Sequence, residues 1–119
     1  MTLNDYQDEA AKTRHISPKL FMLNANGEYV AVPYAYPALG LGEAGEVQNK
    51  IKKIMRDNDG IVTKDIREAV KGELGGLLWY VAMTAKEMGL TLYEVGAYNI
   101  LQLQDRAERG VLQGNGDNR

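Results

Sequence analysis

The sequence predicts an all-α protein, and three observations support that prediction. Apolar residues recur at spacings of three and four along most of the chain, as on one face of a helix. Thr63 and Thr91 stand directly before two such segments, where a helix N-cap belongs. The 119 residues are 45% hydrophobic and 25% charged, which is an ordinary globular composition for one domain, 1–119.

The first part of the chain predicts one short helix and a long loop. Thr2 is a suitable N-cap for a helix over about 2–15, with Asp5 in its first turn. Segment 16–37 contains all three prolines of the chain and an Asn-Ala-Asn-Gly turn signal. We expect an ordered loop there, with room for a short hairpin within 21–32.

Three further helices are expected after this loop. The second runs over about 38–57 and ends at an Asn-Asp-Gly turn. The third follows Thr63 and stops before Gly89, a suitable C′ residue. The fourth begins at Thr91 with a capping box and stops near Gly110. The tail over about 110–119 is polar and glycine-rich.

Glycines within the second predicted helix need a reason, because glycine is costly in a helix. They stand at Gly40, Gly42 and Gly45. Glycine is tolerated where another backbone or a ligand approaches closely. We therefore expect close packing along this part of the chain.

Charge and composition exclude several kinds of site. The net charge of −2 gives no general attraction to polymeric nucleic acid or to anionic membranes. The chain has no cysteine and one histidine, His15, so thiolate sites and multi-histidine metal sites are excluded within one chain. No apolar run is long enough to span a bilayer. We expect a soluble cytoplasmic protein.

The second predicted helix carries charged residues along one face. Glu43, Glu46, Lys50 and Lys53 follow spacings of three, four and three. Clustered carboxylates favour a hard divalent cation, and the lysines suit the phosphates of a nucleotide. The alternative is a solvated face with an ion pair between Glu46 and Lys50.

Polar residues on the other helices allow two readings each. Glu73 lies in the apolar stripe of the third helix and needs a lysine or a metal as partner. Asn99 lies on the inner side of the fourth helix, where it either contacts a nucleotide or satisfies backbone groups. Tyr80 either stacks a base or belongs to the core.

Together these residues resemble a MazG-type nucleotide pyrophosphohydrolase of the all-α NTP-pyrophosphatase group. The family pattern is Glu-x-x-Glu followed later by Glu-x-x-Asp. Segment 42–47, Gly-Glu-Ala-Gly-Glu-Val, matches the first half. Segment 71–80 matches the second half except at Gly76, where the family has Asp. Segments 99–103 and 110–119 resemble the downstream parts of small phage-type members, with Gln102 where lysine is usual.

The resemblance implies antiparallel helices in a four-helix-bundle-like core that is completed by dimerisation, as a homodimer or homotetramer. It implies hydrolysis of a nucleoside triphosphate between its α and β phosphates, with Mg²⁺, or alternatively Mn²⁺, as cofactor. The implied catalytic residues and metal ligands are Glu43, Glu46 and Glu73. The residues expected to contact the substrate are Lys50, Lys53, Asn99, Tyr80 and Arg106.

Gly76 removes one anionic ligand from the implied site, so we expect weaker metal binding as a minimum. A natural divergence, an altered metal preference and an inactivating change remain open. Two other functions also remain: a nucleotide or alarmone binder without turnover, and a helical interaction module whose acidic face is surface. If a phage encodes the chain, its compartment is the host cytoplasm.

Overall fold

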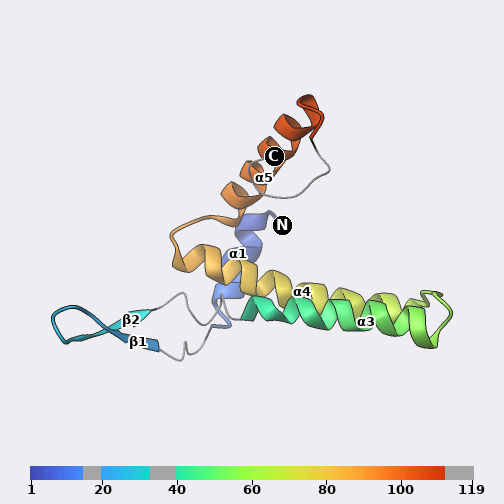
Figure 1. Ribbon diagram of the computed structural model, residues 1–119, viewed down its shortest axis with the longest axis horizontal. Helices are drawn as coiled ribbons and strands as arrows, with labels where there is room; N and C mark the ends of the chain where they lie inside the picture. The colour runs from blue at the N-terminus through green and yellow to red at the C-terminus, as the bar shows by residue number, and fades with distance from the viewer. Residues whose placement is uncertain (15–19, 33–39, 112–119) are drawn as a thin grey trace.

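The computed structural model describes residues 1–14, 20–32 and 40–111. The fold is all-α, as predicted, and the helices of the described residues are accompanied by a two-stranded antiparallel arm. In chain order (Figure 1) the elements are α1 (Leu3–Ala11), β1 (Leu20–Leu23), β2 (Tyr29–Val32), the 3₁₀ turn η1 (Leu41–Glu43), α3 (Ala44–Asp57), α4 (Lys64–Glu87) and α5 (Leu92–Glu108). Within the described ranges, no helix has the length and apolar character that crossing a bilayer requires.

Threonine caps begin three of the helices, as the sequence predicts. Thr2 and Asp5 form a reciprocal capping box, in which the backbone N–H of each residue donates to the side chain of the other at 2.8 and 3.0 Å. Thr91 and Glu94 form the same box at the start of α5. Thr63 caps α4 by accepting from the N–H of Ile66 at 3.3 Å. These bonds satisfy N–H groups that a helix start leaves without partners.

The end of α4 confirms the prediction for Gly89. Its φ of +74° is a left-handed conformation that glycine adopts without a Cβ penalty. The N–H of Gly89 donates to the carbonyl of Lys86, and the N–H of Leu90 donates to that of Ala85 at 2.8 Å. This pair of bonds is a Schellman motif, which turns the chain sharply into α5.

One predicted boundary is wrong, and another is only partly described. α1 ends at Ala11 instead of near residue 15, because the N–H and the hydroxyl of Thr13 both donate hydrogen bonds to the carbonyl of Ala10. The second predicted helix is divided: Gly40 is helical, the 3₁₀ turn η1 follows, and the long helix α3 begins at Ala44, while the predicted start at 38 lies outside the described residues. Glycine is a poor helix former, so the glycine-rich segment before α3 favours this later start. His15 lies outside the described residues, as do 33–39 and the tail from 112 onward.

The hairpin expected within 21–32 is present as the β1–β2 arm. Its strands pair in antiparallel register from Leu20 opposite Val32 to Leu23 opposite Tyr29. The Asn24 side chain orders the connecting turn, because its oxygen accepts from the N–H groups of Asn26 and Glu28. Figure 1 shows the arm projecting away from the helices.

The helices meet around two junctions on α4. α3 and α4 form an antiparallel pair, while α1 and α5 contact each other and the C-terminal half of α4 (Figure 1). A small buried core lies at the second junction and consists of Ala10, Ala82, Met83 and Leu92. In the described part of one chain, α1, α3, α4 and α5 therefore do not form a single bundle.

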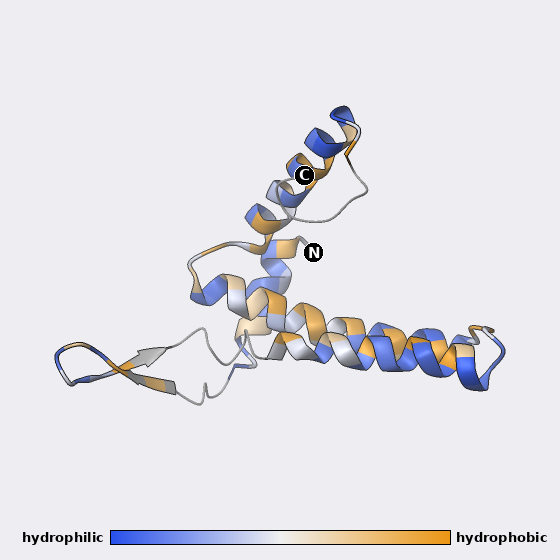
Figure 2. Cartoon of the chain, viewed as in Figure 1, coloured by the Kyte–Doolittle hydropathy of each residue, from blue (hydrophilic) through white to orange (hydrophobic). Residues whose placement is uncertain are grey.

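The molecule is elongated, with extents of 57 × 38 × 31 Å and a radius of gyration of 18.2 Å. A compact domain of this length has a radius of gyration of about 13–14 Å. Figure 2 shows hydrophobic residues along the α3–α4 pair and along α5, and several of them are exposed, among them Ile51, Leu74 and Leu101. The described elements thus leave part of their apolar surface without cover from one another.

Candidate functional site

The charged face of α3 is arranged as its spacing predicts. Glu43 closes η1 and directly precedes α3, Glu46 lies in the first turn, and Lys50 and Lys53 follow along the helix. Both glutamates are exposed. Carboxylates therefore stand at the N-terminal end of the helix, where the macrodipole favours them, and the ammonium groups stand further along.

Lys50 links this face to α4. Its Nζ lies 3.5 Å from Oε1 of Glu73, and each side chain is about one-third exposed, at 36% and 31%. A pair this accessible adds little to stability, because water screens it. It does place a lysine and a carboxylate together between two helices. Within one chain, Lys50 is thus the residue that pairs with Glu73 across the two helices.

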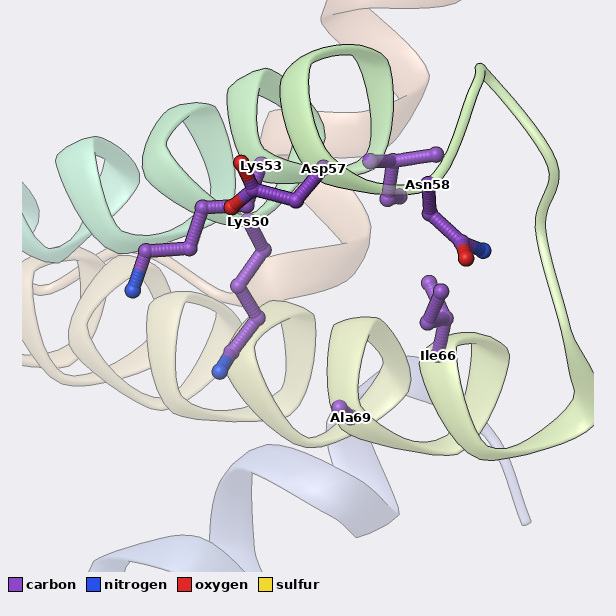
Figure 3. Close-up of a pocket in the computed structure, with 7 residues that line it drawn as sticks. Lys50, Lys53, Asp57, Asn58, Ile66 and Ala69 are labelled. Carbon is purple, nitrogen blue, oxygen red and sulfur yellow. The ribbon is translucent and has the colours of Figure 1, made fainter.

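A hollow of about 350 Å³ lies beside this pair, between α3 and the N-terminal part of α4. Figure 3 shows the side chains of Lys50 and Lys53 extending from α3 toward α4 at its edge. The other lining residues are Ile54, Ile66 and Ala69, which are apolar, and Asp57 and Asn58 at the end of α3. Two ammonium groups next to an apolar surface suit an anionic ligand that also has a less polar part.

The hollow lined by Lys50 and Lys53, the lysine hollow, also contains a negative charge, that of Asp57. Arg56 donates two hydrogen bonds to its carboxylate at 2.7 and 2.8 Å, and these hold the pKa of Asp57 below its ordinary value. The charge of Lys53 acts in the same direction. Sequence reasoning did not include Asp57, although its position four residues after Lys53 places it on the same helical face. No pattern in the sequence indicated that Ile66 and Ala69 would line this hollow.

The three predicted metal ligands are not gathered around one point. Glu73 faces Lys50, whereas Glu46 lines a separate outer hollow of about 540 Å³ with Gln48, Asn49 and Lys52. In the described part of the chain, no three Asp, Glu, His or Cys side chains could hold a metal ion together. The donor atoms are the oxygens that Mg²⁺ prefers, but their grouping within one chain is incomplete.

Gly76 lies one helical turn after Glu73 and is exposed. A Cβ added there would meet no atom within 4 Å, and the same holds at Gly75. An aspartate side chain would therefore fit at position 76 without moving its neighbours.

Tyr80 lies against the chain that enters η1. A side chain at Gly40 would overlap the Tyr80 ring, so the Gly40 backbone packs directly on it. The Trp79 ring stands edge-on to Tyr80 with centroids 5.1 Å apart, and its Nε1 donates to Thr13. Close packing predicted for the glycines is thus found at Gly40, whereas Gly42 and Gly45 have open space.

The two predicted substrate residues on α5 lie apart from the lysine hollow. Asn99 lines a different hollow, of about 750 Å³, beside Leu3 and Ile100. Arg106 is half-buried in the last turn of α5. Within one chain, the structure brings together Lys50, Lys53 and Glu73 but does not bring Asn99 or Arg106 to them.

Comparison with known proteins identifies a phage relative. The chain is 49% identical over 86 residues to the Gene 37 protein of Mycobacterium phage L5, which covers 71% of this chain and 75% of that protein. No protein-family model matches the chain, and no solved structure matches it. Identity at this level over most of both chains establishes common ancestry, so the chain belongs to the family of the Gene 37 protein of Mycobacterium phage L5.

Proposed function

We propose that the chain is a nucleoside triphosphate pyrophosphohydrolase of the MazG type, which cleaves between the α and β phosphates to give a monophosphate and pyrophosphate. The observation that carries the proposal is the contact of Lys50 with Glu73 across α3 and α4. It brings Glu73, from the second half of the motif, to the helix that follows the first half, beside Lys53 and the lysine hollow.

In this proposal the lysines bind the polyphosphate. Lys50 and Lys53 provide mobile ammonium groups that neutralise phosphate oxygens, and the apolar floor at Ile54 and Ile66 receives a less polar part of the ligand. A phosphate that binds Lys50 competes with Glu73 for the same ammonium group. Glu73 is then released as a carboxylate beside the substrate, where it can orient the attacking water.

Magnesium is the cofactor that this activity requires. Glu43, Glu46 and Glu73 are the residues that would hold it, because carboxylate oxygens are its preferred ligands. When bound, the ion would neutralise charge that develops on the phosphates. Since a single chain does not group these three side chains, we infer that ligand binding or a second copy of the chain completes the set.

The apolar side of the α3–α4 pair suits a second copy. A hollow of about 280 Å³ on that side is lined by Ile51, Val62, Val70 and Leu74 with two basic residues, and Ile51 and Leu74 are exposed. Two such pairs packed together would form the four-helix bundle that the family resemblance implies. We propose a homodimer or homotetramer that acts in the cytoplasm, where nucleoside triphosphates are present.

Substitution of the lysines tests the proposed substrate site. We expect Lys50→Gln and Lys53→Gln each to lower kcat/KM for pyrophosphate release about ten- to a hundredfold, because each removes a charge-assisted bond to phosphate of about 1.5–3 kcal/mol. Lys12→Gln is the control, since Lys12 is an exposed lysine at the C-cap of α1, paired with Glu9. Equal activity of all three variants and the unmodified chain would reject the lysine hollow as the phosphate site.

The second candidate is a nucleotide or alarmone binder without turnover. The ungrouped carboxylates and the glycine at position 76 favour it. A binder is stabilised by its ligand, because a ligand that binds the folded state alone raises the melting temperature. Nucleotide-dependent stabilisation that is lost in Lys50→Gln, without pyrophosphate release, would identify this function.

A further inference from the structure

The turn after α3 places a polar side chain at the lysine hollow that the proposed mechanism does not use. This residue is Asn58, which is partly buried and lines the hollow together with Lys50 and Lys53. Figure 3 shows the two lysines at one end of the hollow and Asn58 beside Ile66 at the other. The two ends therefore offer different polar groups to a ligand.

Asn58 is held in place by hydrogen bonds from three of its groups. Its backbone N–H donates to the carbonyl of Ile54 at 3.1 Å, and its backbone carbonyl accepts from the N–H of Ile61 at 2.8 Å. Its side-chain Nδ2 donates to the carbonyl of Ile61 at 2.6 Å. Because Nδ2 is engaged in this bond, the oxygen Oδ1 is the side-chain atom that remains to accept a hydrogen bond from a ligand.

The distance between the two ends suits the nucleoside part of a nucleotide. Asn58 is the C-cap of α3, and at 1.5 Å of rise per residue it lies roughly 8–12 Å along the helix from Lys53 and Lys50. The ribose is bonded directly to the phosphates, and the base is attached on its far side. With the phosphates at the lysines, the base reaches Asn58, and its flat face lies on the apolar lining at Ile54 and Ile66.

Apart from the lysines, the polar side chains of this lining offer acceptors. They are Oδ1 of Asn58 and the carboxylate of Asp57. An exocyclic amino group on a base donates to such atoms, whereas a carbonyl oxygen at the same position sets one acceptor against another. Acceptors that meet without a donor between them lower the affinity, because both lose their bonds to water.

We propose that Oδ1 of Asn58 accepts a hydrogen bond from the exocyclic amino group of the base, so that the chain selects nucleotides with an amino-bearing base. This assignment rests on the proposed binding of the phosphates by Lys50 and Lys53. The lysines hold one end of the ligand, and Asn58 distinguishes ligands at the other end. The Asn-Asp-Gly segment, which the sequence predicts only as a helix stop, thereby also contributes to substrate selection.

Two pairs of nucleotides test this selection. ATP and ITP differ by an amino group or a carbonyl oxygen at position 6 of the purine, and CTP and UTP differ in the same way at position 4 of the pyrimidine. We expect kcat/KM for pyrophosphate release with Mg²⁺ to favour the amino member of at least one pair about ten- to a hundredfold. Equal values within both pairs, or higher values for the carbonyl members, would overturn the proposal.

Two substitutions of Asn58 separate recognition of the base from support of the turn. Asn58→Ala removes both Oδ1 and the bond to Ile61, and we expect it to abolish the preference. Asn58→Asp also removes the bond to Ile61 but keeps an acceptor oxygen, so the preference should remain. Asn49→Ala is the control, because Asn49 is a partly buried residue of α3 in the outer hollow with Glu46. A preference that persists in Asn58→Ala, or that both Asn58 variants lose equally, contradicts the assignment.

Lys50→Gln distinguishes failure of this inference from failure of the proposed function. If nucleotides bind without turnover, the same two pairs are compared by the shift of melting temperature, and the same order is expected. Release or binding that weakens in Lys50→Gln but does not distinguish the members of either pair would overturn the role of Asn58 alone. No release and no shift of melting temperature with any of the four nucleotides would overturn the proposed function and this inference with it.

Discussion

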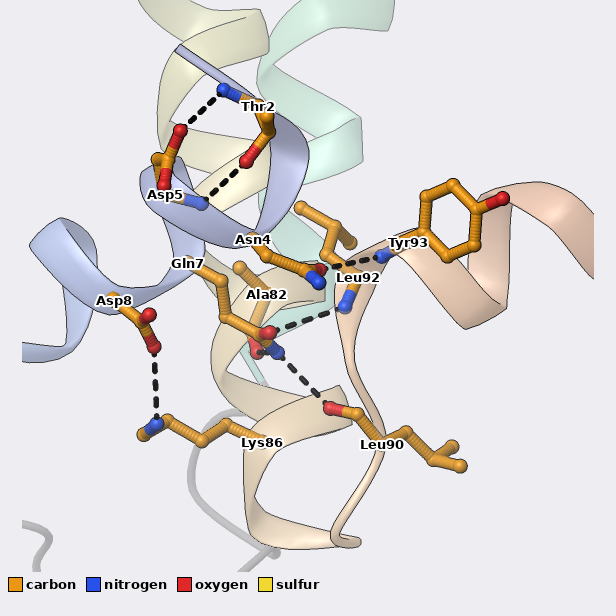
Figure 4. A network of polar contacts seen from close by, with 10 residues as sticks. All are labelled: Thr2, Asn4, Asp5, Gln7, Asp8, Ala82, Lys86, Leu90, Leu92 and Tyr93. Carbon is orange, nitrogen blue, oxygen red and sulfur yellow. Dashed lines mark hydrogen bonds and ion pairs between the residues drawn. The ribbon is translucent and has the colours of Figure 1, made fainter.

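At the scale of single residues, Gln7 holds three elements together. It is buried, with 4% of its surface exposed. Its Nε2 donates to the carbonyls of Ala82 and Leu90, and its Oε1 accepts from the N–H of Leu92, each at 3.1 Å. Figure 4 shows this side chain between α1 and the turn from α4 to α5. Gln7 thereby satisfies the Leu90 carbonyl and the Leu92 N–H, which the sharp turn leaves without helical partners, and adds a bond to the Ala82 carbonyl inside α4.

We predict that Gln7→Met lowers the free energy of unfolding by about 2–4 kcal/mol, because the Leu90 carbonyl and the Leu92 N–H would lose their partner. Gln48→Met is the control, since Gln48 is exposed on α3. Chemical denaturation at fixed protein concentration measures both. Similar stability of the two variants would show that the Gln7 bonds contribute little.

Glu94 gives a prediction for pH. Hydrogen bonds from the backbone N–H and the hydroxyl of Thr91 lower the pKa of Glu94 from the ordinary value of 4.5. The folded state therefore favours the charged carboxylate. Its stabilising effect is complete above the ordinary pKa and is lost as the pH falls through the lowered, folded-state pKa.

We expect Glu94→Gln to weaken the loss of stability on acidification, measured as the urea midpoint against pH, because the amide accepts a hydrogen bond but does not titrate. Glu108→Gln, at the other end of α5, is the control. Some pH dependence will remain, since Asp5 has a lowered pKa for the same reason in α1. Identical profiles for Glu94→Gln and the unmodified chain would contradict this explanation.

Caps and glycine stops are local features, and the sequence predicts them well. Thr2, Thr63 and Thr91 begin helices because each cap bonds to a residue three positions away. The role of Gln7 could not be predicted, because its partners lie more than seventy residues away in sequence. Such bonds depend on how segments that are distant in sequence pack together. A local sequence pattern does not predict that packing.

At the scale of elements, the entry into α3 depends on one close contact. Gly40 packs against the Tyr80 ring, while Gly42, two residues later, has open space. The two positions differ in tertiary contact and share the same residue type. They therefore form a matched pair that separates packing from helix propensity.

We predict that Gly40→Ala destabilises the protein by about 1–3 kcal/mol, because the added methyl overlaps the Tyr80 ring and forces a local shift. Gly42→Ala should instead stabilise it by about 0.5–1 kcal/mol, since alanine costs less than glycine in a helical turn. Thermal or chemical denaturation of the two variants measures the difference. A stabilising effect of Gly40→Ala would contradict the described contact.

The sequence predicts the two helices that carry the halves of the acidic motif. It does not predict how the residues of these helices lie relative to one another and to α5. Helical spacing places Lys50 and Lys53 on one face, and the structure confirms that they line one hollow. The floor of that hollow comes from Ile66 and Ala69, which belong to another helix. Asn99 is expected at the site from its place on the inner side of its helix and from the family resemblance. The direction of α5 places it elsewhere in a single chain.

At the scale of the whole molecule, shape connects the candidate site with assembly. The elongated chain exposes apolar residues on the arm, on the α3–α4 pair and on α5. The same chain leaves the carboxylates of the motif ungrouped in its described residues. Both features are expected of a subunit whose surfaces are covered by further copies.

The most direct measurement is the release of pyrophosphate and monophosphate from nucleoside triphosphates with Mg²⁺ by the unmodified chain, Gly76→Asp and Gly75→Asp. Both glycines have open space, so either aspartate fits, but only position 76 follows Glu73 by one helical turn. We predict release by the unmodified chain and about tenfold faster release by Gly76→Asp, which corresponds to about 1.4 kcal/mol of barrier. Gly75→Asp should not accelerate it. No release by any of the three, with no change of melting temperature on adding nucleotide and Mg²⁺, would contradict the proposed function.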